Sequence, residues 1–119
     1  MNDTATTAPR INAGVKDLHK ALIAQQQALV DRLSRVRSSD EADALVREMH
    51  EINFRVMTCG SLLFKQTSAQ IDTQVESVID ATGDLESAIA SATRIAAVIK
   101  AASKFLGLVD KVLDKIKLA

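Results

Sequence analysis

The stretch VIDATGDLESAIA, residues 78–90, determines whether the later part of the chain is one helix or two. Gly83 is of the type preferred just past a helix end, and Asp84 is of a type favoured as an N-cap. Apolar residues nevertheless recur at helical spacing through the stretch, with Leu85 and Ile89 beyond the glycine. The local signal therefore predicts a turn, whereas the periodicity predicts a continuous helix.

Helix length favours the turn. A helix running from residue 40 to residue 117 would be about 115 Å long at 1.5 Å per residue. A chain of 119 residues has little material with which to stabilise so long a helix. We therefore predict that the chain turns at Gly83-Asp84, between one helix over residues 40–82 and another over residues 84–117.

An earlier reversal is predicted at Ser38-Ser39-Asp40, where three residues in a row favour a helix N-cap. Apolar residues before it, from Ile11 to Val36, have a helical period and predict a first helix over residues 11–37. After it, a seven-residue repeat typical of helices packed along a partner runs through Leu45, Met49, Ile52, Val56, Cys59 and Leu63.

This repeat slips by one residue near Gly60, so the middle helix is predicted to bend or break there. A break gives four helices, which can close a core within one chain. An unbroken helix would leave apolar faces open, and a symmetric dimer would cover them. The sequence thus predicts an all-α fold, an antiparallel helical bundle of three long helices, or four if the middle one breaks, completed by dimerisation.

Composition fits a single helical domain. Hydrophobic residues make up 47% and aromatic residues 3%, so the core is predicted to be aliphatic. The one proline, Pro9, leaves every later residue free to be helical. Residues 1–10 are small, polar and threonine-rich and are predicted to be a disordered tail, and residues 11–119 to be one domain.

Charge is balanced overall, with 15 basic and 15 acidic residues. An acidic middle lies between two basic flanks, which indicates that the flanks fold back onto the middle. The zero net charge, and the lack of aromatic residues in the small basic cluster Arg32, Arg35 and Arg37, make nucleic acid an improbable partner. Cations at the end of a helix suit its dipole without any ligand.

The first ten residues lack the apolar core of a secretory signal, and no run of about 18 uncharged apolar residues occurs. We therefore predict a cytoplasmic protein, and export without such a signal stays open.

Catalytic and metal-binding patterns are lacking. Cys59 lies on the apolar repeat, where a free cysteine is usually a small buried hydrophobe. The acids nearest His19 and His50 are at spacings that point the side chains to different helix faces, which does not suit a metal. No phosphate-binding loop or nucleophile elbow occurs. We predict no enzymatic activity, no cofactor and no metal.

The C-terminal segment KFLGLVDKVLDKIKLA, residues 104–119, carries the predicted functional surface. On a helix it has a basic face of Lys104, Lys111 and Lys115. Its other face is a candidate interaction surface for a protein partner or lipid, although a helix packed on its own bundle has the same pattern. That apolar face consists of Phe105, Leu106, Val109, Val112, Leu113 and Ile116.

Two functions follow from these features. The first is a non-enzymatic, homo-oligomeric module for protein–protein interaction, of the adaptor, inhibitor, immunity or chaperone type. The alternative is a membrane-active protein that uses the amphipathic, Ala- and Lys-rich segment 85–119. In composition, the Gln-, Ser-, Thr- and Ala-rich stretch over residues 66–91 resembles long bacterial helical-hairpin proteins.

Overall fold

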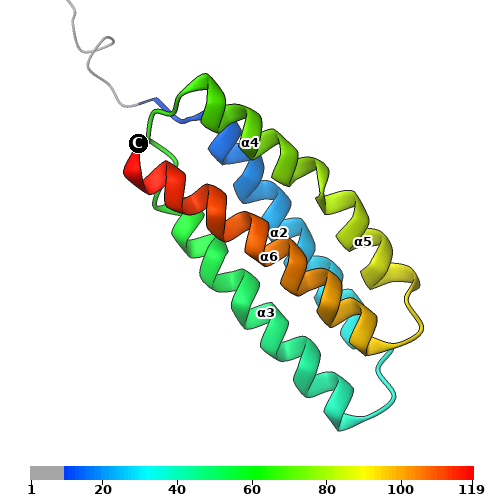
Figure 1. Cartoon of the computed structure of the whole chain (residues 1–119). Coiled ribbons are helices and arrows are strands. Elements are labelled where there is room, and N and C mark those ends of the chain that lie inside the picture. Colours follow the sequence, from blue (N-terminus) through cyan, green and yellow to red (C-terminus); the bar gives the residue numbers. More distant parts are fainter. Residues whose placement is uncertain (1–9) are drawn as a thin grey trace, which may run out of the picture.

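Residues 10–119 are described by the structure, a computed structural model, and every regular element among them is a helix (Figure 1). The prediction of an all-helical fold is therefore confirmed. The predicted disordered tail lies outside the described residues, apart from Arg10. In chain order the helices are α2 (Ala13–Leu33), α3 (Ser39–Gly60), α4 (Ala69–Asp80), α5 (Thr82–Ser91) and α6 (Ile95–Leu118).

Side-chain caps begin three of these helices. Asn12, Ser38 and Ser68 each accept a hydrogen bond from a backbone N–H three residues on, at the start of α2, α3 and α4. Ser38 thus caps the helix that follows the reversal predicted at residues 38–40. Asn12 also donates from Nδ2 to the carbonyl of Lys65 at 2.9 Å and to the hydroxyl of Thr67 at 2.8 Å. The start of α2 is therefore tied to the loop between α3 and α4.

The predicted middle helix is interrupted after Gly60. A break at this point was one of the two predicted alternatives. Helix α3 ends at Gly60, and residues 61–68 form a loop before α4 begins. The backbone N–H of Ser61 donates to the carbonyl of Met57 at 3.1 Å, which closes the last turn. Because of this break the described chain contains four helical rods, and the apolar faces of the rods cover one another.

The predicted turn at Gly83-Asp84 is wrong. Ala81 joins α4 to α5 in helical geometry, with φ −69° and ψ −13°, and no glycine among the described residues has a positive φ. Gly83 lies inside α5. Buried Leu85 and Ile89 continue the apolar stripe of α4 into α5, and their burial outweighs the roughly 1 kcal/mol cost of a glycine within a helix.

The actual reversal lies about ten residues later, at residues 92–94. The backbone is extended at Ala92 (ψ 131°) and at Arg94 (ψ 133°), where α5 gives way to α6. Arg32 of α2 donates from Nη1 to the carbonyl of Ile89 at 2.7 Å. A helix leaves its last carbonyls without intrahelical partners, so this bond stabilises the end of α5.

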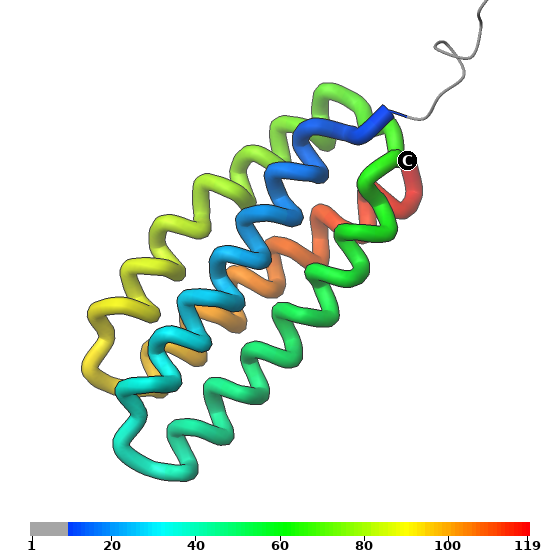
Figure 2. The backbone as a smooth tube through the Cα atoms, turned by 180° about the vertical axis from the view of Figure 1, so that it is seen from behind, coloured from blue at the N-terminus to red at the C-terminus, as the bar shows by residue number. Residues whose placement is uncertain are grey.

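The four rods are α2, α3, the pair α4–α5, and α6, and each rod contacts two others. Helix α2 contacts α3 and α4–α5, and α6 contacts the same two (Figures 1 and 2). Pairs joined by short turns, α2 with α3 and α5 with α6, are antiparallel. Helices α3 and α6 instead run in the same direction, and so do α2 and α4–α5.

This parallel pairing differs from the all-antiparallel packing that the sequence predicted. Contacts along α6 keep an almost constant separation in sequence: 55 residues between Arg55 of α3 and Asp110, and 54 residues between Lys65 of the following loop and Ala119, just past the end of α6. The physical reason is the loop over residues 61–68. A loop of that length can reach about 26 Å, enough to cross from α3 to the diagonally opposite rod.

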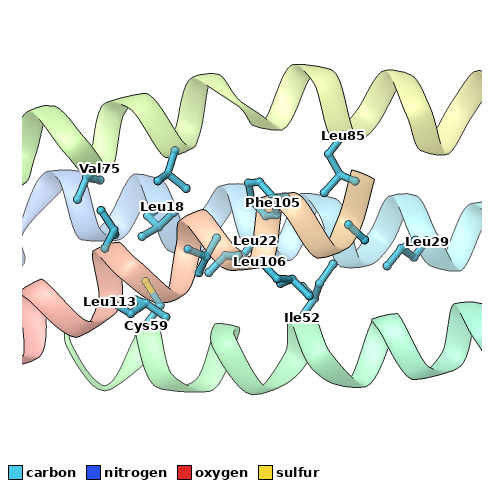
Figure 3. Packing of buried hydrophobic residues seen from close by; sticks show 14 of the residues in the cluster. Leu18, Leu22, Leu29, Ile52, Cys59, Val75, Leu85, Phe105, Leu106 and Leu113 are labelled. Carbon is cyan, nitrogen blue, oxygen red and sulfur yellow. The ribbon is translucent and has the colours of Figure 1, made fainter. Parts of the chain in front are cut away.

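Aliphatic side chains fill the space between the rods (Figure 3). Helix α6 supplies more of this core than any other helix, and its Phe105 is the only aromatic residue in the cluster. The buried residues of α6 are Val98, Ala102, Phe105, Leu106, Val109, Val112, Leu113 and Ile116.

Candidate interaction surface

The apolar face predicted to bind a partner or lipid lies in the core of the chain itself. Its six residues are at most 6% exposed, because α6 packs between α3 and α4–α5. The face is therefore covered by the chain's own helices and is not an open surface in this structure. The residues concerned are Phe105, Leu106, Val109, Val112, Leu113 and Ile116.

The predicted basic face is exposed to solvent. Lys104, Lys111 and Lys115 all lie on the outer side of α6. Lys104 lines a shallow groove between α5 and α6 together with Asp84, and Lys115 lines another beside α4. These lysines lie on the opposite side of the molecule from the contact between α2 and α3.

Cys59 is buried, as the sequence predicted. Its thiol donates to the carbonyl of Val15 at 3.5 Å, and burial raises its pKa to about 11. A thiol with so high a pKa stays protonated near neutral pH and is a poor nucleophile. His19 lies against Gly60, and His50 is exposed on α3. Among residues 10–119 no three His, Cys, Asp or Glu side chains are grouped as metal ligands.

The arginine cluster at the end of α2 lines a pocket of about 250 Å³ beside the end of α5, and two of its members contact backbone. Arg32 and Arg35 donate to the carbonyls of Ile89 and Ala90, the latter at 3.5 Å. These carbonyls lie in the last turn of α5, where the helix dipole favours positive charge. The cluster therefore stabilises the reversal at residues 92–94.

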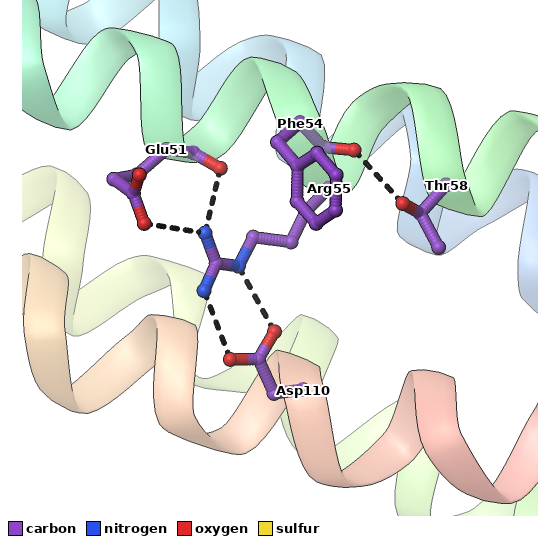
Figure 4. A network of polar contacts seen from close by, with 5 residues as sticks. All are labelled: Glu51, Phe54, Arg55, Thr58 and Asp110. Carbon is purple, nitrogen blue, oxygen red and sulfur yellow. Dashed lines mark hydrogen bonds and ion pairs between the residues drawn. The ribbon is translucent and has the colours of Figure 1, made fainter.

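Arg55 joins α3 to α6 (Figure 4). Its Nε and Nη2 each donate to a carboxylate oxygen of Asp110 at 2.9 Å, and Nη1 donates to the side chain of Glu51 at 3.0 Å. Hydrogen bonding to Asp110 is the main reason that the pKa of Arg55 is raised. A bidentate ion pair of this kind constrains the orientation of the two side chains as well as their distance, so it sets the parallel register of the two helices.

Glu48 is a buried acid beside this pair. It is 8% exposed and lines a cleft of about 420 Å³ between α3 and α6, together with Arg47 and Ser103. Burial raises the pKa of the Glu48 carboxyl, and the charge of Glu51 raises it further. The carboxylate is therefore a source of instability within the folded chain.

The largest exposed apolar side chains lie along the outer side of α3 and just past its end. Phe54 is 65% exposed and Met57 is 67% exposed, and Phe64, four residues beyond the end of the helix, is 57% exposed. The chain has three phenylalanines, so two of them face solvent. The guanidinium of Arg55 lies 5.9 Å from the centre of the Phe54 ring.

The neighbouring side of α2 extends this apolar surface. Gly60 of α3 lies against His19 of α2, since a Cβ built at Gly60 would be 3.3 Å from Nε2 of His19. This close approach gives the register of the two antiparallel helices. Ile23, one turn beyond His19, is therefore level with the turn of α3 that carries Met57. Ile23 is 44% exposed, and Val30, two turns further on, is 39% exposed. We call Ile23, Val30, Phe54 and Met57 the α2–α3 face.

A signal for this surface is present in the sequence. Phe54 and Met57 do not belong to the seven-residue repeat of α3, so they must lie on the side of the helix away from the core. Large apolar residues on the outer side of an amphipathic helix are unusual in a chain with so few aromatics. The regular amphipathic pattern of the C-terminal segment is that of a core helix.

Comparison of the chain with protein-family models, with curated proteins and with solved structures found no match. Within residues 10–119, no helix combines the length and the apolar character needed to cross a membrane.

Proposed function

We propose that the chain is a helical bundle that works as a non-enzymatic module for protein–protein interaction, of the adaptor, inhibitor, immunity or chaperone type. One observation carries the proposal: Phe54 and Met57 are each about two-thirds exposed, side by side on the outside of α3. Aromatic residues and methionine are enriched where proteins bind one another, and an exposed apolar patch is a frequent mark of such a site.

A photo-crosslinking amino acid placed at Phe54 tests this proposal in cells that express the full chain. We expect covalent adducts with a protein at this position. Ser87, exposed on α5 and far from the α2–α3 face, is the matched control and should give none. A second substitution, Met57→Asp, should abolish the adducts at position 54 because it places a charge in the patch. Equal crosslinking at both positions, or none at position 54, would contradict the proposal.

The membrane-active alternative gains no support from the same surface. It requires the apolar face of segment 85–119 to contact lipid, and that face includes Val109 and Ile116, both fully buried. Exposing this face would remove much of the core. It would lower the free energy of unfolding by about 2 kcal/mol for each large side chain exposed. We expect the full chain not to float with anionic vesicles at low salt.

A further inference from the structure

We infer that the α2–α3 face binds the same face of a second copy of this chain, forming a two-fold symmetric dimer. The inference rests on the proposed function and names its partner. Area, apolar character and charge each support it.

The area of the face suits a stable dimer. Helices α2 and α3 have 21 and 22 residues, so each is about 32 Å long at 1.5 Å per residue. Two packed helices are about 20 Å wide. The resulting footprint of about 600 Å² is of the order that one partner buries in a typical stable interface, about 800 Å².

The centre of this footprint is apolar. Phe54 and Met57 on α3 lie level with Ile23 on α2, and all three are exposed. Asn53 and Gln27, which lie nearby, are uncharged. Large apolar side chains at the centre with polar residues around them are the usual arrangement of an interface between proteins.

Charged residues are divided between the two ends of the face. Lys16 and Lys20 lie at the end near Gly60, and Asp31 and Asp43 lie toward the turn that joins α2 to α3. All four are exposed, and among residues 10–119 none of them forms an ion pair. One end of the face is therefore basic and the other acidic.

Other charged residues near these ends belong to other sides of the molecule. Asp17 lines a cleft beside α4, and Arg47 lines the cleft between α3 and α6. Arg35 and Arg37 line a pocket together with residues 90–93, on the side of the molecule that carries α5. They therefore leave the separation of charge on the α2–α3 face intact.

A two-fold axis that passes through the apolar centre, in the plane of the interface and perpendicular to the helices, places the basic end of one copy against the acidic end of the other. The same operation does this twice, because a symmetric interface repeats each contact. The face is thus complementary to itself in charge, and attraction between opposite charges selects this orientation over the alternatives. A partner of a different sequence would need the same order of charges to fit as well.

Charge exchange between two variants tests the inference. One variant carries Lys16→Glu and Lys20→Glu, so both ends of its face are acidic. The other carries Asp31→Lys and Asp43→Lys, so both ends are basic. Light scattering at micromolar concentration should give twice the chain mass for the natural protein and the mass of one chain for each variant alone. An equimolar mixture of the two variants should again give twice the chain mass.

A variant at the apolar centre gives a second measurement. Met57→Asp should raise the dissociation constant of the dimer at least about 30-fold. Its helical circular dichroism should not change, because Met57 is 67% exposed and contributes little to the core. Ser87→Asp, on the other side of the molecule, should leave the dimer intact.

A single-chain mass for the natural protein overturns the inference, and so does a mixture of the charge variants that fails to reassociate. Dimers that persist in both charge variants overturn it as well. These results are separable from failure of the proposed function. If the natural protein is a single chain yet position 54 crosslinks to another protein in cells, the interaction module stands and its partner is not a second copy.

Discussion

Replacement of Gly83 by alanine should stabilise the protein by about 1 kcal/mol. Gly83 lies within α5 with an ordinary helical backbone, and a Cβ built there has no atom within 4 Å outside its own helix. Alanine therefore gains the full difference in helix propensity without steric cost. The gain comes largely from the unfolded chain, which loses conformational freedom when glycine is replaced.

Thermal unfolding followed by circular dichroism measures this effect. A gain of about 1 kcal/mol should raise Tm by about 4 °C for a domain of this size, and chemical denaturation should show the same change in free energy with an unchanged m-value. Gly60→Ala is the matched control. A Cβ at Gly60 would lie 3.3 Å from Nε2 of His19, so His19 must shift and the gain should fall toward zero.

A loss of about 1 kcal/mol on Gly83→Ala would refute this reasoning. Alanine is destabilising where glycine has a positive φ, as at a helix C-cap. Such a result would mean that the chain turns at Gly83-Asp84 and that α4 and α5 do not form one rod.

Three further predictions concern the core and the buried polar groups. Phe105→Ala should lower the free energy of unfolding by about 3–5 kcal/mol, whereas Phe105→Leu should cost less than about 1.5 kcal/mol in the same denaturation experiment. Glu48→Gln should stabilise the protein at neutral pH, because the folded-state pKa of Glu48 lies above its ordinary value of 4.5 and the natural protein loses stability as pH rises through that interval. The gain from Gln should disappear below about pH 4.5, and an equal gain at all pH values would contradict it. Cys59 should react with a thiol reagent at pH 8 only as fast as the protein opens, because its side chain is fully buried and burial raises its pKa to about 11, and rapid labelling of the native protein would show that the thiol is accessible.

Periodicity was the most reliable guide to the helices. The spacing of apolar residues predicted the all-helical class, and Ser38 marked the first reversal because its hydroxyl caps α3 directly. The slip in the repeat near Gly60 marked the break that creates a fourth rod. These features depend on neighbours within one or two turns, so a single sequence contains them.

Properties set by distant residues were harder to predict. Gly83-Asp84 has the residues of a turn, but the cost of a helical glycine is small compared with the burial of Leu85 and Ile89. The parallel pairing of α3 and α6 brings Arg55 to Asp110, 55 residues away. No local pattern indicates such a contact.

The candidate surface could have been found from the sequence. Phe54 and Met57 fall outside the apolar repeat of α3, which already places them away from the core. Their use as an interface was not evident, because the amphipathic C-terminal helix gave a stronger pattern. That pattern is equally typical of a helix that packs between others, and α6 is such a helix.

Because α3 runs parallel to α6, and α2 to α4–α5, the two outer sides of the molecule are formed by different helices and differ in character. Residues 10–119 form two helical hairpins stacked in the same orientation, and residues 61–68 are the covalent connection between them. Each hairpin covers one face of the other and leaves its own far face open. Phe54 and Met57 are exposed on one outer side of the stack, and Lys104 and Lys115 are exposed on the opposite side. The two sides can therefore change independently, so a new binding property on the lysine side need not disturb the apolar side.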